Sequence, residues 1–285
     1  MLKNNDLQSK HFRGDFLVSN GALIKCSNFE FEKLSKQPFV YEVIRVISSV
    51  PLFLEDHFER FERSMRIAAI SNPFLFSEIN ATLQLLINSN SIENGNIKIV
   101  YPALSKTSTS GLTAFFIPHK YPDSEQYRKG VEIVTLIQSR PNPNAKISNP
   151  DLRKQADEII ANRNVFEVLL IEESGIITEC SRANIFFIKQ DQIITSPESL
   201  ILKGITREYI FKICNQNGIS LKEKIIHQSN LQHVNATFIT GTSPKVLPVC
   251  KIDEYSYTTD NPLLLKVMEL YNKEIDKYIS KKKTQ

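Results

Sequence analysis

Hydrophobic residues in the first 120 positions follow two different periods. Short apolar or alternating runs indicate strands, whereas apolar positions three and four apart indicate helices. Strands are predicted at 39–47, 51–54, 97–101 and 113–117. Helical spacing predicts one helix over 56–70 and a second that Ser77 is placed to cap, with apolar positions at Ile79, Leu83, Leu86 and Ile87. This half of the chain therefore has an α+β pattern.

The second half starts a new series after a polar stretch. Residues 118–128 hold two prolines and few apolar side chains, which is typical of a linker. Beyond it the pattern predicts strands at 131–136, within 167–187, at 193–195, near 219–222 and at 237–240. Helices are predicted to end near 161, to begin at 206 and to cover 261–279. We therefore expect a small α+β domain over residues 1–118, a linker over 119–130 and a larger α/β domain over 131–285.

Composition removes several classes of protein. The 285 residues are 41% hydrophobic and 23% charged, which suits two globular domains. No apolar run approaches the roughly 20 residues that cross a bilayer, and the first residues lack the apolar stretch of a signal peptide. We therefore expect a cytoplasmic protein that does not bind membranes. The net charge of +4 is modest, and Lys281, Lys282 and Lys283 come without interleaved aromatic residues, so no nucleic-acid partner is expected.

Cysteine and histidine spacing offers no metal site. The cysteines are scattered and form no C-x-x-C pair, which argues against a disulfide framework and a zinc site; they are Cys26, Cys180, Cys214 and Cys250. The five histidines never form an H-x-x-x-H pair. We therefore expect reduced, mostly buried thiols and no metal.

Two loops of the second half have features of anion-binding turns. In the first, an apolar strand end at Leu202 reaches Gly204 and enters a helix with Thr206 at the capping position. Free amides and the dipole at a helix start attract anions. In the second, residues 238–243 place small hydroxyl side chains around a glycine. Taken alone, the first loop is more typical of a simple capped helix, and the second also fits a plain turn. Two such loops in one domain favour a phosphate ligand.

Two charged residues are candidates for chemistry in the second half. Glu179 lies among apolar strand residues, where a carboxylate calls for a cation. Lys146 lies in a loop rich in proline and asparagine, 21 residues before Glu167 and 33 before Glu179. Taken alone, a loop lysine is usually a solvated charge and a strand-end glutamate usually faces water.

The order and spacing of these residues resemble the signature of the class IV aminotransferases. The matching segments are 41–46, 51–57 with Arg60, Lys146 with Asn149, 167–170, 175–179, 181–186 and 202–207. These pyridoxal-phosphate enzymes of fold type IV include branched-chain aminotransferases, D-amino acid aminotransferase and aminodeoxychorismate lyase. The likeness spans about residues 39–249. It implies a homodimer of two-domain subunits, with a small α+β domain and a larger domain that has a β-barrel-like core and flanking helices.

The resemblance also implies a role for each matched residue. Lys146 would form a Schiff base with pyridoxal 5′-phosphate and then move a proton between the substrate and cofactor carbons. Glu179 would pair with the pyridine nitrogen and keep it protonated, so that the ring accepts electrons. The phosphate would be held by Arg60, the amides of Ile205 and Thr206, and Thr242. Tyr41 would line the substrate side of the site, although a core-facing aromatic is equally open.

Two reactions remain open. The leading hypothesis is transfer of an amino group between an amino acid and a 2-oxo acid, which the pair Tyr41-Glu42 favours. The alternative is aminodeoxychorismate lyase, which releases pyruvate and 4-aminobenzoate in folate synthesis. The residues 178–180 and Ala183-Asn184 resemble the lyase.

The sequence departs from the family pattern at three places. Two of them concern substrate recognition, and the third concerns the start of a helix. Where many relatives carry an Arg-Gly pair that grips the substrate carboxylate, this chain reads Tyr101-Pro102-Ala103-Leu104. Residues 36–40 replace a glycine-rich turn. Pro150 follows Asn149, which suggests that the next helix begins later. The substrate, and the choice of L- or D-amino acids, are therefore not predicted.

Overall fold

The computed structural model describes residues 11–31, 38–103 and 111–284. The described residues divide into two compact units. Unit 1 contains the chain up to Lys120 together with 145–148 and the residues from Asp276 onward, and unit 2 contains Tyr121–Asn144 and Asn149–Ile275. The chain thus leaves unit 1 within the expected linker. Some residues at which the sequence departs from the family pattern lie outside the described residues; they are residues 36 and 37 and Leu104.

Unit 1 is built on a six-stranded antiparallel sheet in the order β2-β1-β6-β5-β3-β4. The strands are β1 (Phe16–Ser19), β2 (Ala22–Lys25), β3 (Phe39–Ile47), β4 (Val50–Pro51), β5 (Gly95–Pro102) and β6 (Thr113–Ile117). A short 3₁₀ helix, η1 (Cys26–Asn28), follows β2, and the two long helices are α3 (Leu54–Ile67) and α4 (Phe76–Asn90). The bounds predicted for β3 and β6 are confirmed. The strand predicted at 51–54 is wrong beyond Pro51, because residues 52 and 53 form a turn and α3 begins at Leu54.

The two faces of this sheet bury different clusters. Alternate residues of β3 point to opposite faces. Val40, Ile44 and Val46 pack with residues of α3 and α4, including Phe61 and Leu83, in one cluster. Phe39 and Tyr41 belong to a second cluster with aromatic residues from the N-terminal segment and β6, namely Phe12, Phe29, Phe31 and Phe115.

The first turn of α4 differs from the prediction. Leu75, not Ser77, is the N-cap residue, and the carboxylate of Glu78 accepts a hydrogen bond from the Leu75 amide at 2.8 Å. Ser77 lies inside the helix. The start of this helix is therefore stabilised by the bond from the N-cap amide to the Glu78 side chain, as in a capping box, and not by a hydroxyl cap.

The β1–β2 hairpin was not predicted, although its turn has a recognisable signal. Asn20 and Gly21 connect the strands with φ of 53° and 75°, so both central residues have positive φ. Asn-Gly is the pair that a two-residue hairpin turn of this kind favours. The polar turn residues between two short apolar runs could have identified it.

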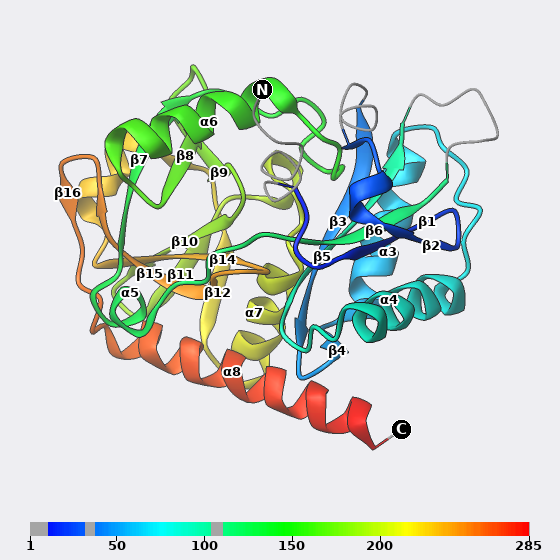
Figure 1. Cartoon of the computed structure of the whole chain (residues 1–285). Coiled ribbons are helices and arrows are strands. Elements are labelled where there is room, and N and C mark those ends of the chain that lie inside the picture. The colour runs from blue at the N-terminus through cyan, green and yellow to red at the C-terminus, as the bar shows by residue number, and fades with distance from the viewer. Residues whose placement is uncertain (1–10, 32–37, 104–110, 285) are drawn as a thin grey trace. The chain divides into compact units, whose positions relative to one another are not determined.

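Unit 2 is built on a curled ten-stranded sheet in the order β12-β11-β10-β14-β15-β7-β8-β9-β13, with β16 paired to β15 (Figure 1). The strands are β7 (Val131–Ile137), β8 (Glu167–Ile171), β9 (Ile176–Cys180), β10 (Asn184–Lys189), β11 (Gln192–Thr195), β12 (Ser220–Glu223), β13 (Ile226–His227), β14 (Ala236–Gly241), β15 (Lys245–Ile252) and β16 (Tyr255–Ser256). The pairs β7–β8, β7–β15 and β11–β12 are parallel. The predicted mixed α/β fold with a barrel-like core is confirmed, although β13, β15 and β16 were not predicted.

Four longer helices accompany this sheet: α5 (Ser124–Lys129), α6 (Pro150–Arg163), α7 (Ile205–Gln216) and α8 (Pro262–Lys283). Two 3₁₀ helices are also present: η2 (Glu198–Leu200) between β11 and α7, and η3 (Gln228–His233) between β13 and β14. Helix α5 occupies the second half of the segment expected to be a linker, where Asp123 caps it by accepting from the Gln126 amide at 2.8 Å. None of the helices among the described residues is long and apolar enough to span a membrane.

Helix α6 covers the strands β7 and β8 (Figure 1). Leu152 and Ala156 pack against Val168 and Leu170 of β8. The expectation that Pro150 delays this helix is wrong. Pro150 is its first residue. Proline is tolerated there because an N–H at the first helical position would have no acceptor within the helix. Asn149 caps the helix by accepting from the Leu152 amide at 3.1 Å.

Candidate active site

Glu179 is a buried carboxylate near the end of β9, with 3% of its surface exposed. Arg140, from the loop after β7, donates from Nε to Oε1 at 3.0 Å. The Nδ2 of Asn184 donates to Oε2 at 3.3 Å. Each carboxylate oxygen can accept more than one hydrogen bond, so this arrangement still allows a further donor. Glu179 is therefore buried with a cation, Arg140, beside its carboxylate.

Arg140 is a partner of the candidate residue Glu179 that the sequence did not indicate. Its Nη2 also donates to the carbonyl of Ser181 at 3.0 Å, so the guanidinium joins the loop after β7 to the end of β9. Arg140 and Glu179 are 39 positions apart, and an arginine at the start of a loop rich in proline and asparagine carries no local signal of such a contact.

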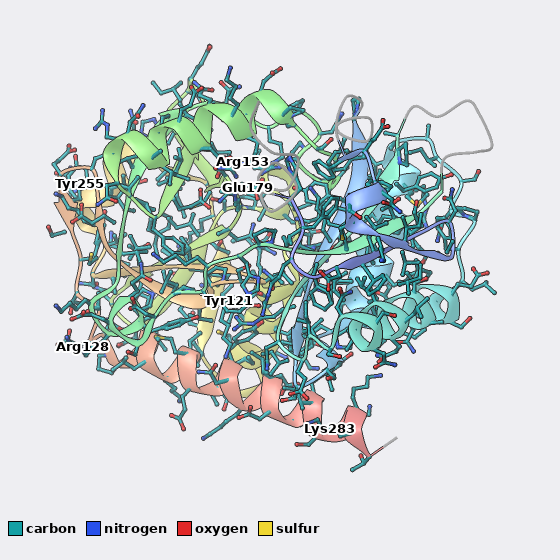
Figure 2. The ribbon with its side chains drawn as sticks, viewed as in Figure 1. Tyr121, Arg128, Arg153, Glu179, Tyr255 and Lys283 are labelled. Atoms are coloured by element: carbon teal, nitrogen blue, oxygen red, sulfur yellow. The ribbon has the colours of Figure 1, made fainter. Side chains whose placement is uncertain are left out.

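A second buried carboxylate supports the same strand end. The hydroxyl of Ser181 donates to Glu167 and accepts from Nη1 of Arg153 at 3.1 Å. Arg153 of α6 thus contacts a residue two positions after Glu179, and both Arg153 and Glu179 are labelled in Figure 2. Burial raises the pKa of the Cys180 thiol well above its usual value, and the charges of Glu167 and Glu179 raise it further, so this thiol stays neutral.

Helix α7 begins without a side-chain cap. Its N-cap residue is Gly204, which has no side chain to accept from the first-turn amides. Thr206 is therefore not the cap that the sequence suggested. It lies inside the first turn, and its hydroxyl is buried 3.2 Å from that of Tyr271. Uncapped amides at a helix start are suited to a ligand anion.

Asn184 links this helix start to Glu179. Besides its bond to the carboxylate, its Nδ2 donates to the carbonyl of Leu202 at 2.9 Å. A Cβ on Gly204 would lie 2.1 Å from the side-chain oxygen of Asn184. A glycine is thus required for the close approach of α7 to β10.

The end of β14, just before the turn that contains Thr242, holds a buried hydroxyl that the described residues leave unsatisfied. Thr240 is 1% exposed, and its Oγ1 has no hydrogen-bond partner within the described part of the chain. It pairs in register with Asn184 of β10. Thr242 follows in the turn and is partly exposed. Because an orphaned buried hydroxyl is costly, this loop has the chemistry expected of a ligand-binding turn.

The larger domain expected over 131–285 included Lys146, whereas residues 145–148 group with unit 1, where Lys146 contacts Tyr41. Residues 145–148 run beside β3, where Val40 bridges Ile147 and the Tyr41 amide donates to the Lys146 carbonyl at 3.1 Å. The Lys146 Nζ lies 4.8 Å from the ring centroid of Tyr41. The Lys146 amide donates to the hydroxyl of Ser64 on α3 at 3.0 Å. Backbone bonds on both sides thus hold this lysine next to the aromatic ring.

Arg60 is 4% exposed and forms a two-pronged ion pair with Glu42 of β3. Its Nε and Nη2 donate to the two carboxylate oxygens at 2.8 and 2.6 Å, and His57 Nδ1 contacts Oε2 at 2.7 Å. Burial would raise the pKa of Glu42, but the charge and hydrogen bonds of Arg60 and the bond to His57 outweigh it and lower the pKa to about 2. Burial lowers the pKa of His57 despite its carboxylate neighbour, so a neutral imidazole donates this bond.

The candidate residues therefore form two groups. Glu179, Ile205, Thr206 and Thr242 belong to unit 2, and Tyr41, Arg60 and Lys146 belong to unit 1. No cluster of three or more metal-ligating side chains occurs among the described residues.

The profile of the family described as amino-transferase class IV matches residues 39–252. The chain belongs to the class IV aminotransferases. The chain is 30% identical to the D-alanine aminotransferase of Bacillus licheniformis over 229 residues, which cover 75% of this chain and 78% of that protein. It is 25% identical to the aminodeoxychorismate lyase of Bacillus subtilis, with 85% and 87% covered.

Solved structures of class IV aminotransferases have the same fold. A protein of Thermotoga maritima assigned as a branched-chain amino acid aminotransferase superimposes with a TM-score of 0.79 and 26% identity, covering 91% of this chain and 95% of that one. The family uses pyridoxal 5′-phosphate. Its members among the relatives are aminotransferases and the related lyase, so this class IV aminotransferase is an enzyme of that group.

Proposed function

We propose that this chain binds pyridoxal 5′-phosphate and moves an amino group between an amino acid and a 2-oxo acid. The observation that carries the proposal is the buried carboxylate of Glu179, which Arg140 and Asn184 hold in a fixed orientation. A carboxylate kept charged in a partly dry site favours a protonated partner nitrogen. When bound, the cofactor's protonated ring accepts the electrons released as a substrate C–H bond breaks.

Unit 2 has the donors that a phosphate requires. The amides of Ile205 and Thr206 begin an uncapped helix, and the hydroxyl of Thr242 lies in the turn after β14. The unsatisfied hydroxyl of Thr240 and the glycine at position 204 support a close ligand in this region. These donors would bind the phosphate and orient the ring toward Glu179.

Unit 1 supplies the reactive amine. Lys146 would attach the cofactor through its Nζ, release it when a substrate amine arrives, and then hold and move a proton at that nitrogen. Tyr41 borders this amine and would line the substrate side. Arg60 would add charge to the phosphate site, and Glu42 fixes the plane of its guanidinium while taking two of its five N–H donors.

The second candidate reaction is release of pyruvate and 4-aminobenzoate from aminodeoxychorismate. The segment 178–180 with Ala183-Asn184 favours it, and so does the likeness to the Bacillus subtilis lyase. Higher identity to the D-alanine aminotransferase favours amino transfer. For either reaction we infer a cytoplasmic homodimer by analogy with the family.

Reduction with borohydride tests the assignment of the reactive lysine. Purified wild-type protein should be yellow, and borohydride should fix the cofactor to the peptide that contains Lys146. Lys146→Ala should lose this adduct, whereas Lys154→Ala, a change at an exposed residue of α6, should keep it. A colourless wild type that gains no absorbance with added cofactor would contradict the proposal.

A second assay separates the two reactions. If single amino acids convert the loaded enzyme to its pyridoxamine form, the protein is an aminotransferase. Pyruvate release from aminodeoxychorismate without that conversion would instead assign the lyase.

A further inference from the structure

Lys98 and Lys146 flank the ring of Tyr41 on one face of the sheet in unit 1. The Lys98 Nζ lies 5.0 Å from the Tyr41 centroid and 4.7 Å from that of Phe39, and the Lys146 Nζ lies 4.8 Å from the Tyr41 centroid. The backbone pairing explains why Lys98 and Lys146 lie on either side of Tyr41. Tyr41 pairs with Val100 of β5, two residues from Lys98, and its amide donates to the carbonyl of Lys146 on the other side.

The ammonium group of Lys98 lies against aromatic rings. Its Nζ forms no ion pair with any aspartate or glutamate in the part of the chain that the structure describes. Burial lowers the pKa of Lys98; the Tyr41 hydroxyl opposes this effect, and the charge of Lys146 adds to it. Contact with two rings offsets only part of the cost of taking an ammonium out of water, so an anion beside it would be strongly favoured.

The substrates of both candidate reactions supply such an anion. Amino acids, 2-oxo acids and aminodeoxychorismate all carry carboxylates. Their reacting carbon must come close to Lys146, and Lys98 borders the same aromatic ring as that lysine. The Arg-Gly pair that grips this carboxylate in many relatives is replaced here at 101–104. Lys98 is a cation on the same strand, three residues before Tyr101.

We infer that Lys98 binds the substrate carboxylate through a charge-assisted hydrogen bond from its Nζ. The inference rests on the proposed function, because it takes Lys146 as the amine at which the substrate reacts. A lysine is a compact point charge without the two-pronged fork of arginine, so it fixes the position of one carboxylate oxygen and not the plane of the group.

Calorimetric titration of the cofactor-loaded enzyme tests this inference. The ligands are 4-methylpentanoate, glutarate and the uncharged 4-methylpentanamide. Lys98→Met keeps the length of the side chain and removes its charge. It should weaken carboxylate binding by about tenfold or more, whereas binding of the amide should change by less than about twofold. Lys98→Arg should keep carboxylate affinity within about threefold, since it retains the cation. Lys25→Met, a change at an exposed residue of β2, is the control.

The outcomes separate this inference from the proposed function. Equal weakening of both carboxylates in Lys98→Met would assign Lys98 to the carboxylate that all substrates share, and weakening of glutarate alone would assign it to a side-chain carboxylate. Carboxylate affinities that do not change in Lys98→Met, in a variant that loads cofactor like the wild type, would overturn the inference. Failure of the wild type itself to load cofactor would overturn the proposed function.

Discussion

The guanidinium of Arg140 donates to the carboxylate of Glu179 at 3.0 Å, and both side chains are almost completely buried. Removing one partner of such a pair leaves the other charge buried without compensation. We expect Arg140→Gln to lower the free energy of unfolding by about 3 kcal/mol or more, measured by urea titration. Arg163→Gln, at the exposed end of α6, should change it by less than about 0.5 kcal/mol.

The double variant Arg140→Gln, Glu179→Gln tests whether this loss belongs to the pair. If the ion pair is responsible, the double variant should lose less stability than the two single losses added together. Additive losses would show that Arg140 acts through its bond to the Ser181 carbonyl instead.

Charge at Glu179 should affect turnover more than cofactor attachment. Glu179→Gln keeps the shape of the side chain but no longer stabilises a protonated ring nitrogen. We expect the variant to retain the borohydride-trapped adduct at Lys146 and to lose about 10²-fold or more in kcat. Glu254→Gln, at an exposed position between β15 and β16, should have wild-type kcat. Full activity of Glu179→Gln would exclude the assigned role.

The buried Glu42–Arg60 pair should make stability depend on acid pH. The folded-state pKa of Glu42 is about 2, below the usual value of 4.5, so the unfolded chain binds more protons between these values. The contribution of Glu42 is therefore complete above pH 4.5 and is lost as the pH falls toward 2. Thermal melts from pH 7 to pH 2 should show this loss in the wild type. Glu42→Gln should already be less stable by about 3–5 kcal/mol at pH 7, because the Arg60 charge is then unpaired.

An exposed carboxylate provides the matched control for the pH series. Glu173→Gln changes a residue in the turn between β8 and β9 and should leave the pH dependence as in the wild type. If the wild type and Glu42→Gln curves run parallel below pH 4.5, the buried pair does not cause the acid sensitivity.

Position 204 should tolerate only glycine, because the side chain of Asn184 lies where a Cβ would be. Gly204→Ala brings a methyl group to 2.1 Å from the Asn184 side-chain oxygen, so the amide that also binds Glu179 must move. We expect a loss of about 1–3 kcal/mol in unfolding free energy together with weaker cofactor binding. In an Asn184→Ala background the same substitution should cost less, because the crowded atom is absent. An equal cost in both backgrounds would assign the effect to the backbone of the helix start.

Local patterns in the sequence were sufficient for most of the elements. Alternation in β3 and the apolar run of β6 predicted both strands to the residue, because side-chain period is set by the backbone of the strand itself. Helix starts were less predictable. The starts predicted from Pro150 and Ser77 were both wrong. A helix start depends on which side chain reaches the unpaired amides there, and these side chains are Asn149 and Glu78.

Candidate site residues were found by their order along the chain, but their partners were not. Lys146, Glu179 and Arg60 came from a resemblance that spans most of the sequence. Arg140 and Glu42 were not predicted as the partners of Glu179 and Arg60, because the partners lie 39 and 18 positions apart and no short-range pattern links them.

By itself the sequence determined the family, most of the longer strands and helices, and the residue types available for chemistry, since these depend on periodicity and on residues in a fixed order. Only the tertiary structure decided which charges pair. Arg140 meets Glu179 because β7 and β9 flank β8, and Lys98 meets Tyr41 because β5 pairs with β3. Strand register creates these contacts. Burial then makes the free-energy cost of leaving either charge unpaired large.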